Sequence, residues 1–377
     1  MINYINLILL LLACGFSAFL FWCYHSWRRI PEVSSEGSFP PTKLSVIIAA
    51  RNEEKNIIKC LEALCNQDFP DQLVEIILVN DHSSDKTAEL TKNFINEHSS
   101  RLIKLLSLPV GDGGSKKDAL TLGISAATND FILITDADCL VPPTWLSSMM
   151  GFFLHNNAQF LAGPVSINSE KSLFAKIQSL EFMGLVGISA AGISRKLPIM
   201  CNGANLMFSK KVFEEVKGFD APEHFASGDD TQLLIKISKL YPEAVYFLKD
   251  KGAIVRTEGA KGRNDFLQQR KRWAGKIPFA LSAFTVSIAV LAWFTHAFLV
   301  LSLILGVIYG LSPYFVASLG LIFTCEYLLL KSMASFFNKH SVLKLILPMQ
   351  LFYWIYIVLI GAIAPLSKFQ WKGRIRR

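Results

Sequence analysis

The chain has 377 residues and a formal net charge of +8; 51% of its residues are hydrophobic and only 18% are charged. This composition is too apolar for an ordinary soluble enzyme, and the length allows one or two domains with additional segments. The basic residues cluster at the borders of apolar segments and no nucleic-acid-binding motif accompanies them, so we expect a membrane surface and no nucleic acid as partner.

The first element is an apolar segment of residues 5–24 that contains no charged side chain and is followed by Arg28 and Arg29. Crossing a bilayer takes about 20 apolar residues, so this segment is long enough. A cleaved signal peptide is the alternative, but it would carry its basic residues before the apolar segment. We therefore predict a transmembrane helix over residues 1–27, with the two arginines and the domain that follows on the cytoplasmic side.

Residues 40–275 have the composition of a globular domain. Apolar runs typical of buried strands occupy residues 44–50, 74–79, 102–108 and 131–136, and segments with helical periodicity lie between them. Strands that alternate with helices predict an α/β fold with an open, mostly parallel sheet and helices on both faces.

Charged side chains follow the carboxyl ends of these strands, which line the ligand-binding crevice in such a fold. They are Arg51, Glu53, Asp81, Asp136 and Asp138. No Gly-x-Gly-x-x-Gly follows the first strand and no Walker loop is present, so a dinucleotide-binding domain and an ATPase are both disfavoured.

Asp136 and Asp138 are two carboxylates, one residue apart, at the tip of a buried strand. Like charges at such close range repel, and a hard divalent cation relieves the repulsion. Because Mg²⁺ typically binds one or two carboxylates together with substrate phosphates, the pair predicts a site for a metal-bound diphosphate. A polar turn with two solvated aspartates is the alternative.

Beyond residue 158 the pattern is less regular. We expect a strand within residues 160–167, a long helix over residues 173–193, and a turn of small residues that runs into a strand at residues 201–208. Asp229 and Asp230 precede an apolar-periodic helix, where acids also simply stabilise the helix start. The seven cysteines lack metal-ligand spacing and are expected to be reduced thiols.

A membrane bundle is predicted over residues 276–367, because the apolar segments 277–330 and 345–366 are too long for soluble core helices. Gly310 and Pro313 mark a break between two helices in the first segment. The basic tail, residues 368–377, should be cytoplasmic, which requires an even number of crossings after residue 276. Length alone gives three helices, so either an additional short helix or a re-entrant or interfacial segment must restore the parity.

The motifs occur in a distinctive order. They are Ala50-Arg51-Asn52-Glu53, Asn80-Asp81, Asp136-Ala137-Asp138, Asp229-Asp230 and Gln269-x-x-Arg272-Trp273. In this order they resemble family 2 glycosyltransferases of the GT-A fold, a group that includes membrane-embedded cellulose, chitin and hyaluronan synthases and ceramide glucosyltransferases. The resemblance covers residues 40–275, and the flanking apolar helices suit it.

The resemblance implies an inverting, metal-dependent transferase that takes a sugar from a nucleotide-diphosphate sugar, most often UDP-linked. The implied nucleotide-sugar contacts are Ala50, Arg51, Glu53, Asp81, Lys117, Asp136, Asn202 and Asn205. The implied ligands of Mg²⁺ or Mn²⁺ are Asp138 and Asp136, with Asp138 the more direct. The implied catalytic residues are Asp230 as base, its neighbour Asp229, and Gln269, Arg272 and Trp273, which would close over the diphosphate and the acceptor entrance.

The sequence departs from the processive synthases in two respects. Its acidic motif reads Gly228-Asp229-Asp230 rather than Thr-Glu-Asp, and only one apolar helix precedes the domain. A single transfer to a lipid is therefore as compatible with the motifs as growth of a glycan. A processive polysaccharide synthase, and a catalytically silent membrane scaffold or nucleotide-sugar sensor, are the alternatives. The expected location is the inner membrane of a bacterium, with the catalytic domain in the cytoplasm.

Overall fold

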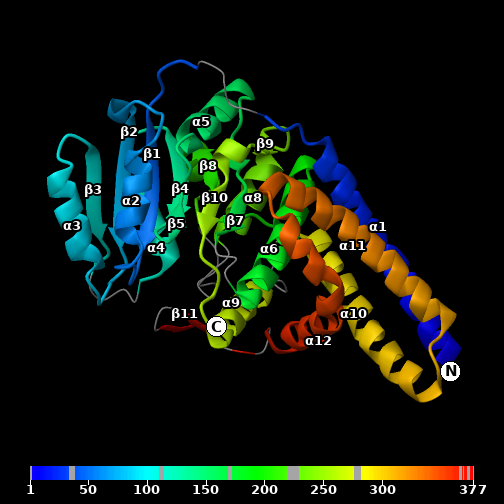
Figure 1. Ribbon diagram of the computed structural model, residues 1–377. Helices are drawn as coiled ribbons and strands as arrows, with labels where there is room; N and C mark the ends of the chain where they lie inside the picture. The colour runs from blue at the N-terminus through cyan, green and yellow to red at the C-terminus, as the bar shows by residue number, and fades with distance from the viewer. Residues whose placement is uncertain are drawn as a thin grey trace.

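The computed structural model describes residues 2–33, 39–109, 114–168, 172–219, 229–275, 282–364, 367, 369–371 and 374–376. It consists of an α/β unit joined to a group of long helices (Figure 1). Gly228 of the acidic motif and residues 368, 372, 373 and 377 of the basic tail lie outside the described residues, as do the side chains of Asp229 and of the whole tail.

A seven-stranded sheet forms the centre of the α/β unit, in the order β3-β2-β1-β4-β8-β6-β9. The first four strands are parallel, and β8 is antiparallel to both of its neighbours. The strands are β1 (Leu44–Ala50), β2 (Val74–Asn80), β3 (Leu102–Ser107), β4 (Phe131–Asp136), β6 (Phe160–Ala162), β8 (Leu206–Ser209) and β9 (Val245–Phe247). The mostly parallel sheet predicted from the apolar runs is confirmed.

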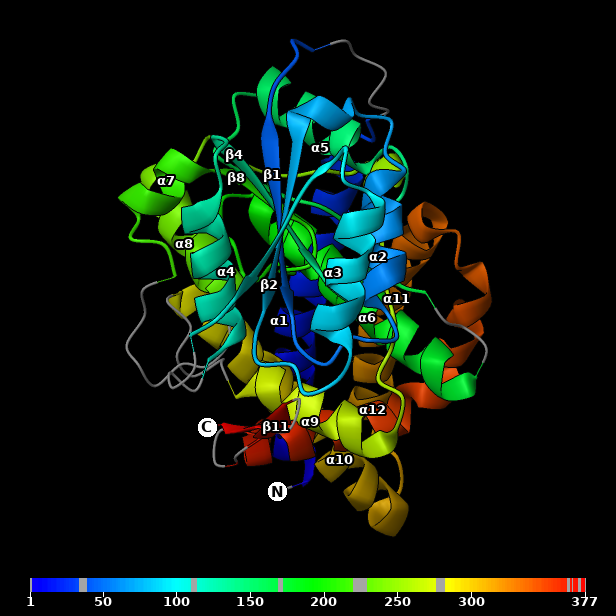
Figure 2. The same ribbon diagram turned by 90° about the vertical axis from the view of Figure 1, so that its left-hand side faces the viewer.

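Helices cover both faces of this sheet. Figure 2 shows α2 (Ile57–Cys65) and α3 (Thr87–Glu97) on one side, and α4 (Lys116–Ala126), α7 (Lys210–Glu215) and α8 (Asp229–Leu240) on the other. Helix α4 approaches the sheet very closely at Gly123, where an added Cβ would lie 2.6 Å from the Cγ2 of Ile47. Helix α5 (Trp145–His155) and the 3-10 turns η1 (Asp71–Leu73) and η2 (Lys251–Ala253) complete the unit.

The single strand expected within residues 160–167 is wrong in one respect. Gly163 and Pro164 divide the segment, because proline lacks the N–H that a continuing strand needs. Only β6 belongs to the large sheet. The second half, β7 (Val165–Ile167), joins a small sheet with β10 (Val255–Thr257) and β5 (Cys139–Leu140).

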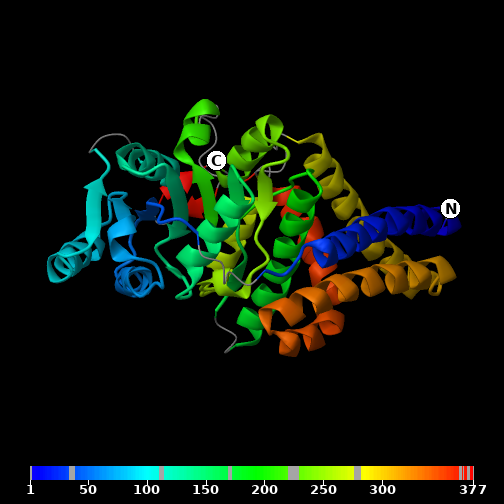
Figure 3. The ribbon, with the colours of Figure 1, turned by 90° about the horizontal axis from the view of Figure 1, so that it is seen from above.

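The long helices extend away from the sheet, as Figure 3 shows from above. Helix α1 (Ile2–Arg29) packs along α10 (Ala283–Tyr309) and α11 (Pro313–Phe337), and the chain end of α1 lies far from the α/β unit. The predicted break at Gly310 is confirmed; its φ of 91° is favourable only for glycine. Five helices of the described residues are long and apolar enough to cross a membrane: α1, α6 (Leu173–Ser194), α10, α11 and α12 (Ile346–Ile363) with the turn before it.

Two of these five helices stay close to the α/β unit. Helix α6 is mostly buried and packs on β7 and β9. Helix α12 begins beside this unit, because η4 (His340–Leu345) packs on α6 and the Nζ of Lys339 donates to the carbonyl of Ile167. Helix α12 also ends beside this unit. Gly275 lies so close to Ala364, the residue after α12, that an added Cβ on Gly275 would be 3.3 Å from the carbonyl oxygen of Ala364.

The chain after α12 returns to the same place. A hairpin of β11 (Phe369–Trp371) and β12 (Arg374–Arg376) packs on α9 (Arg263–Ala274), which belongs to the α/β unit (Figure 1). Both ends of α12 and the chain that follows therefore lie on the α/β side of the long helices.

One hydrophobic core runs from the sheet into the long helices. Trp27 of α1 is 1% exposed and makes edge-on ring contacts with Phe247 of β9, at 6.1 Å, and Phe336 of α11, at 5.2 Å. The Nζ of Lys249 lies 4.5 Å from the centre of the same indole. The seven cysteines are unpaired, and five of them are buried in these apolar surroundings.

Candidate functional site

Three neighbouring parallel strands end together at one open cavity of about 520 Å³. Ala50 at the end of β1 is paired with Asn80 of β2, and Ala49 is paired with Asp136 of β4. The cavity is lined by seven of the residues predicted from the sequence: Ala50, Arg51, Glu53, Asp81, Asp136, Asp138 and Arg272. The structure therefore brings these strand-end residues together at one cavity.

One side of the cavity is built by Arg51 and Asp81. The Nη1 of Arg51 donates to the carbonyl of Asp81 at 2.8 Å and lies 3.8 Å from its Oδ1, which also contacts the Nδ1 of His82 at 3.1 Å. The carboxylate of Glu53 accepts from the Nδ2 of Asn56 at 2.7 Å. Asp81 and Glu53 are both nearly buried, at 1% and 5% exposed, so these contacts hold their carboxylates in fixed positions.

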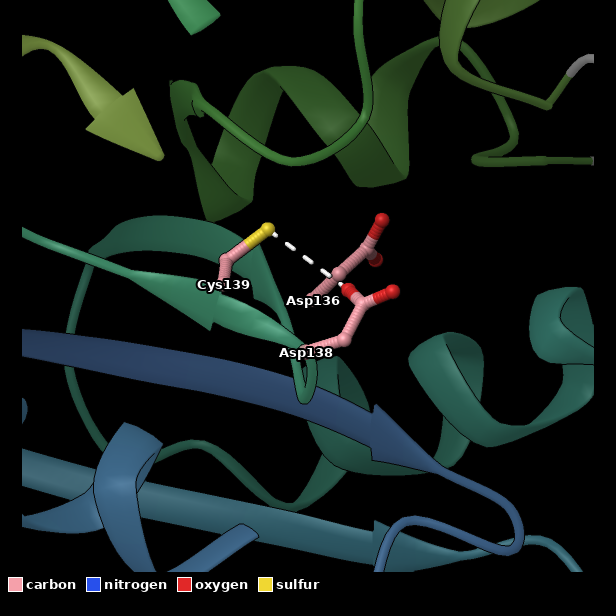
Figure 4. A group of neighbouring side chains, drawn as sticks. All are labelled: Asp136, Asp138 and Cys139. Carbon is pink, nitrogen blue, oxygen red and sulfur yellow. Dashed lines mark hydrogen bonds between the residues drawn. The ribbon is translucent and has the colours of Figure 1, made fainter. Parts of the chain in front are cut away.

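Asp136 and Asp138 line another part of the cavity. Their potential ligand atoms and that of the neighbouring Cys139 all lie within 4.8 Å of one another. Figure 4 shows the Cys139 thiol pointing at the Asp138 carboxylate; its Sγ donates to Oδ1 at 3.7 Å. Burial, followed by the charges of Asp138 and Asp136, raises the pKa of Cys139 well above its usual value, so the thiol stays protonated near neutral pH. A neutral thiol is a poor ligand for a hard cation, whereas the two carboxylates suit Mg²⁺ or Mn²⁺.

Lys116 is the basic residue of α4 that lines the cavity, and the predicted Lys117 is not part of its lining. The Nζ of Lys116 donates to Oδ1 of Asp136. Burial, the largest single effect, would lower the pKa of Lys116, but the charge and hydrogen bond of Asp136 and the charge of Asp230 together outweigh it, and the pKa is raised. A signal for Lys116 is the helix cap: Ser115 accepts from the N–H of Asp118 and makes Lys116 the first helical residue.

Arg272 connects the two acidic parts of the site. Burial lowers the pKa of its guanidinium, and the nearby charges of Asp136, Asp230 and Asp138 oppose that shift. Arg272 lines the cavity together with Asp136 and Asp138, whereas Asp230 is not part of the lining but lies near enough for its charge to act on the guanidinium. An arginine stays protonated near neutral pH, so Arg272 is a positive charge between these acids.

Asp230 is held by backbone N–H groups at the start of α8. Its Oδ2 accepts from the N–H of Gly203 at 3.0 Å, and its Oδ1 accepts from the N–H of Thr231 at 2.8 Å. An added Cβ on Gly203 would lie 3.3 Å from Oδ2, so the small residue allows this close approach. The carboxylate is thus oriented before any ligand binds.

The structure does not support a donor contact for Asn205. This residue is fully buried, and its amide bonds internally to the indole of Trp145 and the carbonyls of Pro164 and Ala253. The Oδ1 of Asn202 accepts from the N–H of Ala204. These two asparagines fix the turn that presents Gly203 to Asp230. A sequence does not distinguish small residues that touch a ligand from small residues that only shape the backbone near it.

Gln269 and Trp273 also have different surroundings from those expected, since neither is part of the cavity lining. The Oε1 of Gln269 accepts from the Nη1 of Arg270 at 2.6 Å. Trp273 packs against Phe182 of α6 with ring centres 6.2 Å apart. Only Arg272 of this motif faces the cavity, and the other two residues pack against the rest of α9 and α6.

Residues 45–217 match the family model described as Glycosyl transferase family 2. A probable glycosyltransferase of Bacillus subtilis strain 168, YdaM, is 28% identical over 251 residues, which cover 66% of this chain and 58% of the relative. A poly-beta-1,6-N-acetyl-D-glucosamine synthase of Staphylococcus epidermidis is 28% identical over 183 residues, which cover 47% of this chain and 42% of the relative. The chain thus spans about half the length of these curated relatives.

A solved structure shares the fold over nearly the whole chain. It is the mannosyltransferase PcManGT from Pyrobaculum calidifontis in complex with GDP-Man and Mn²⁺. The two superpose with a TM-score of 0.63 at 18% sequence identity, covering 97% of this chain and 99% of the other.

Proposed function

We propose a function from one premise: this chain carries a glycosyltransferase family 2 domain of the GT-A fold. The protein moves a sugar from a nucleoside-diphosphate sugar to the hydroxyl of a lipid or a growing glycan, with inversion at the anomeric carbon. The observation that carries this proposal is the cavity lining, which brings Arg272 together with Asp136 and Asp138, with Asp230 near enough for its charge to act on Arg272. A direct displacement requires positive charge beside the leaving group and a base near the acceptor hydroxyl.

Asp230 is the general base. Two N–H donors hold its carboxylate, which suits a group that takes a proton from the acceptor hydroxyl as the hydroxyl oxygen attacks the sugar. The new bond forms between that oxygen and the anomeric carbon while the bond to the diphosphate breaks. The proton remains on Asp230 until product leaves.

The opposite side of the cavity receives the leaving diphosphate. Arg272 offers the planar fork that suits phosphate oxygens, and Lys116 adds a second positive charge beside Asp136. Asp138, with Asp136, would hold Mg²⁺ or Mn²⁺, which supplies additional neutralisation of the charge that develops on the diphosphate. Arg51, Glu53 and Asp81 line the part of the cavity where we place the nucleoside.

The donor experiment that tests this function uses membranes containing the full chain. The membranes are incubated with Mn²⁺ and a panel of labelled UDP-sugars and GDP-mannose, and the product is partitioned between organic and aqueous phases. We expect one donor to label a product, and the phase and length of the product identify the acceptor. A long ladder would favour a processive synthase, which the relative from Staphylococcus epidermidis makes a serious second candidate. No transfer and no donor hydrolysis with any donor would contradict the proposal.

We also propose that the domain lies on the cytoplasmic face of a bacterial inner membrane and that α1, α10 and α11 cross the bilayer. Arg28 and Arg29 at the end of α1 set this orientation. Helix α12 would enter and leave the membrane on the same side, because both of its ends contact the α/β unit. Its exposed side chains are all apolar: Leu347, Pro348, Leu351, Phe352, Ile355, Leu359, Ala362 and Ile363. With two crossings after residue 276, the basic tail would lie on the cytoplasmic side, as expected from its positive charge.

A reporter fused after Arg377 tests this topology. We expect green fluorescent protein at this position to fluoresce and alkaline phosphatase to be inactive, since both report a cytoplasmic end. The matched control places the same reporters in the turn at Gly310, where the opposite pattern is expected. Active phosphatase at the C-terminus would mean that α12 crosses the bilayer.

A further inference from the structure

A buried ion pair lies behind the helix that carries Arg272. Arg270 of α9 is 3% exposed, and its Nε lies 3.2 and 3.1 Å from the two carboxylate oxygens of Glu181 on α6. Its Nη2 donates to Oε2 of the same carboxylate at 2.5 Å. The hydroxyl of Tyr356, on α12, donates to Oε1 of Glu181 at 3.0 Å. Three elements far apart in the sequence therefore meet at one carboxylate.

Aromatic rings hold the guanidinium in place. Its central carbon lies 4.3 Å from the ring centre of Phe266 and 4.3 Å from that of Trp273, one turn before and one turn after it on α9. Phe266 also lies beside the ring of Tyr356, with centres 5.8 Å apart. A charge in such surroundings strongly favours the one geometry in which its partner carboxylate is bonded.

The geometry of α9 gives this pair a role at the cavity. Successive residues of an α-helix are rotated by about 100°, so Arg270 and Arg272 point to nearly opposite sides of the helix. The side with Arg270 is fixed on α6 and α12, and the opposite side presents Arg272 to the cavity that Asp136 and Asp138 also line. A change in the rotation of α9 would therefore move Arg272 relative to the acids.

We propose that Glu181 and Tyr356 are positioning residues: they fix the rotation of α9 through Arg270 and so place Arg272 on the donor diphosphate. This inference rests on the proposed function. It also links the donor site to the membrane, because Tyr356 belongs to the helix whose exposed face is apolar. Trp273 and Gln269 then contribute by packing and bonding with Arg270 and not by touching the donor.

The test replaces Glu181 with glutamine and Tyr356 with phenylalanine in the full chain, reconstituted in nanodiscs. Small displacements of a positioned group can lower rates by about 100-fold, and we expect a loss of this order in kcat/KM for Glu181→Gln, with weaker binding of UDP and GDP in the presence of Mn²⁺. Tyr356→Phe leaves the ion pair in place, so its losses in kcat/KM and in nucleotide binding should be several-fold smaller. If Glu181→Gln does not fold, Tyr356→Phe alone decides the outcome.

A background variant separates positioning from stability. In Arg272→Ala, where the positioned group is absent, Glu181→Gln should weaken nucleotide binding no further. The control is Glu75→Gln, another buried carboxylate, which pairs with Lys104 at 2.7 Å in the sheet and should lower thermal stability without changing nucleotide affinity. Variants of Glu181 and Tyr356 that behave like this control would overturn the proposal, as would a full additional loss in the Arg272→Ala background. If the wild type bound neither nucleotide, the proposed function itself would fail.

Discussion

Asp230→Asn is expected to abolish measurable sugar transfer while the affinity for the nucleotide is retained. The amide is close in shape to the carboxylate and can keep the hydrogen bond from Gly203, so the turn and α8 should stay in place. It cannot accept the proton of the acceptor hydroxyl. Loss of a general base typically lowers a rate by roughly 10²–10⁴-fold, which would bring transfer close to background.

The measurement compares the transfer rate with the affinity for UDP and GDP in the same preparation. Asp265→Asn is a matched control, because Asp265 is also an acid in the first turn of a helix but is exposed. It should leave both quantities unchanged. A transfer rate for Asp230→Asn within tenfold of the wild type would remove Asp230 from the mechanism.

Asp138→Ala is expected to remove the dependence of donor binding on a divalent cation. The two carboxylates of Asp136 and Asp138 lie close together, and Asp136 already has Lys116 as a partner, so Asp138 should contribute most of the direct metal binding. Without it, the diphosphate would be held by Arg272 and Lys116 alone. Since a metal at such a site stabilises the developing charge by several kcal/mol, activity should fall at least about a hundredfold.

Titration of Mn²⁺ or Mg²⁺ against bound nucleotide measures this effect directly. In the wild type the metal should tighten binding, and in Asp138→Ala the curve should become nearly flat. Asp130→Asn, an exposed acid before the opposite end of β4, is the control. An unchanged metal dependence in Asp138→Ala would assign the ligand to another residue.

The sequence was informative wherever a side chain immediately follows a strand. Parallel strands end at one edge of the sheet, so Arg51, Asp81 and Asp136 could be brought together without knowledge of any contact. The periodicity of residues 173–193 likewise predicted α6 to within one residue. Strand ends and long helices are set by local pattern, which a sequence records well.

The sequence was less informative about which way a side chain points within a helix or a loop. Lys116 and Lys117 are adjacent and chemically identical, and the choice between them depends on where the Ser115 cap starts α4. Asn205 lies in a segment that approaches the site, yet its amide faces Trp145. The pairing of Arg270 with Glu181 joins residues 89 positions apart and has no local signature.

The number of membrane crossings also could not be decided from the sequence. Composition alone makes α12 equivalent to α10 and α11. What distinguishes α12 is that Lys339 before it and Ala364 after it both contact the α/β unit, and only the folded chain reveals those contacts.

The hydrophobic core that continues from β9 through Trp27 into α11 has a consequence for how the molecule is held together. A membrane anchor is usually pictured as a tether from which an independent enzyme hangs. In this protein the long helices and the α/β unit share buried side chains, so separating them would expose apolar surface on both. Any boundary drawn near residue 275 therefore cuts through one continuous hydrophobic core.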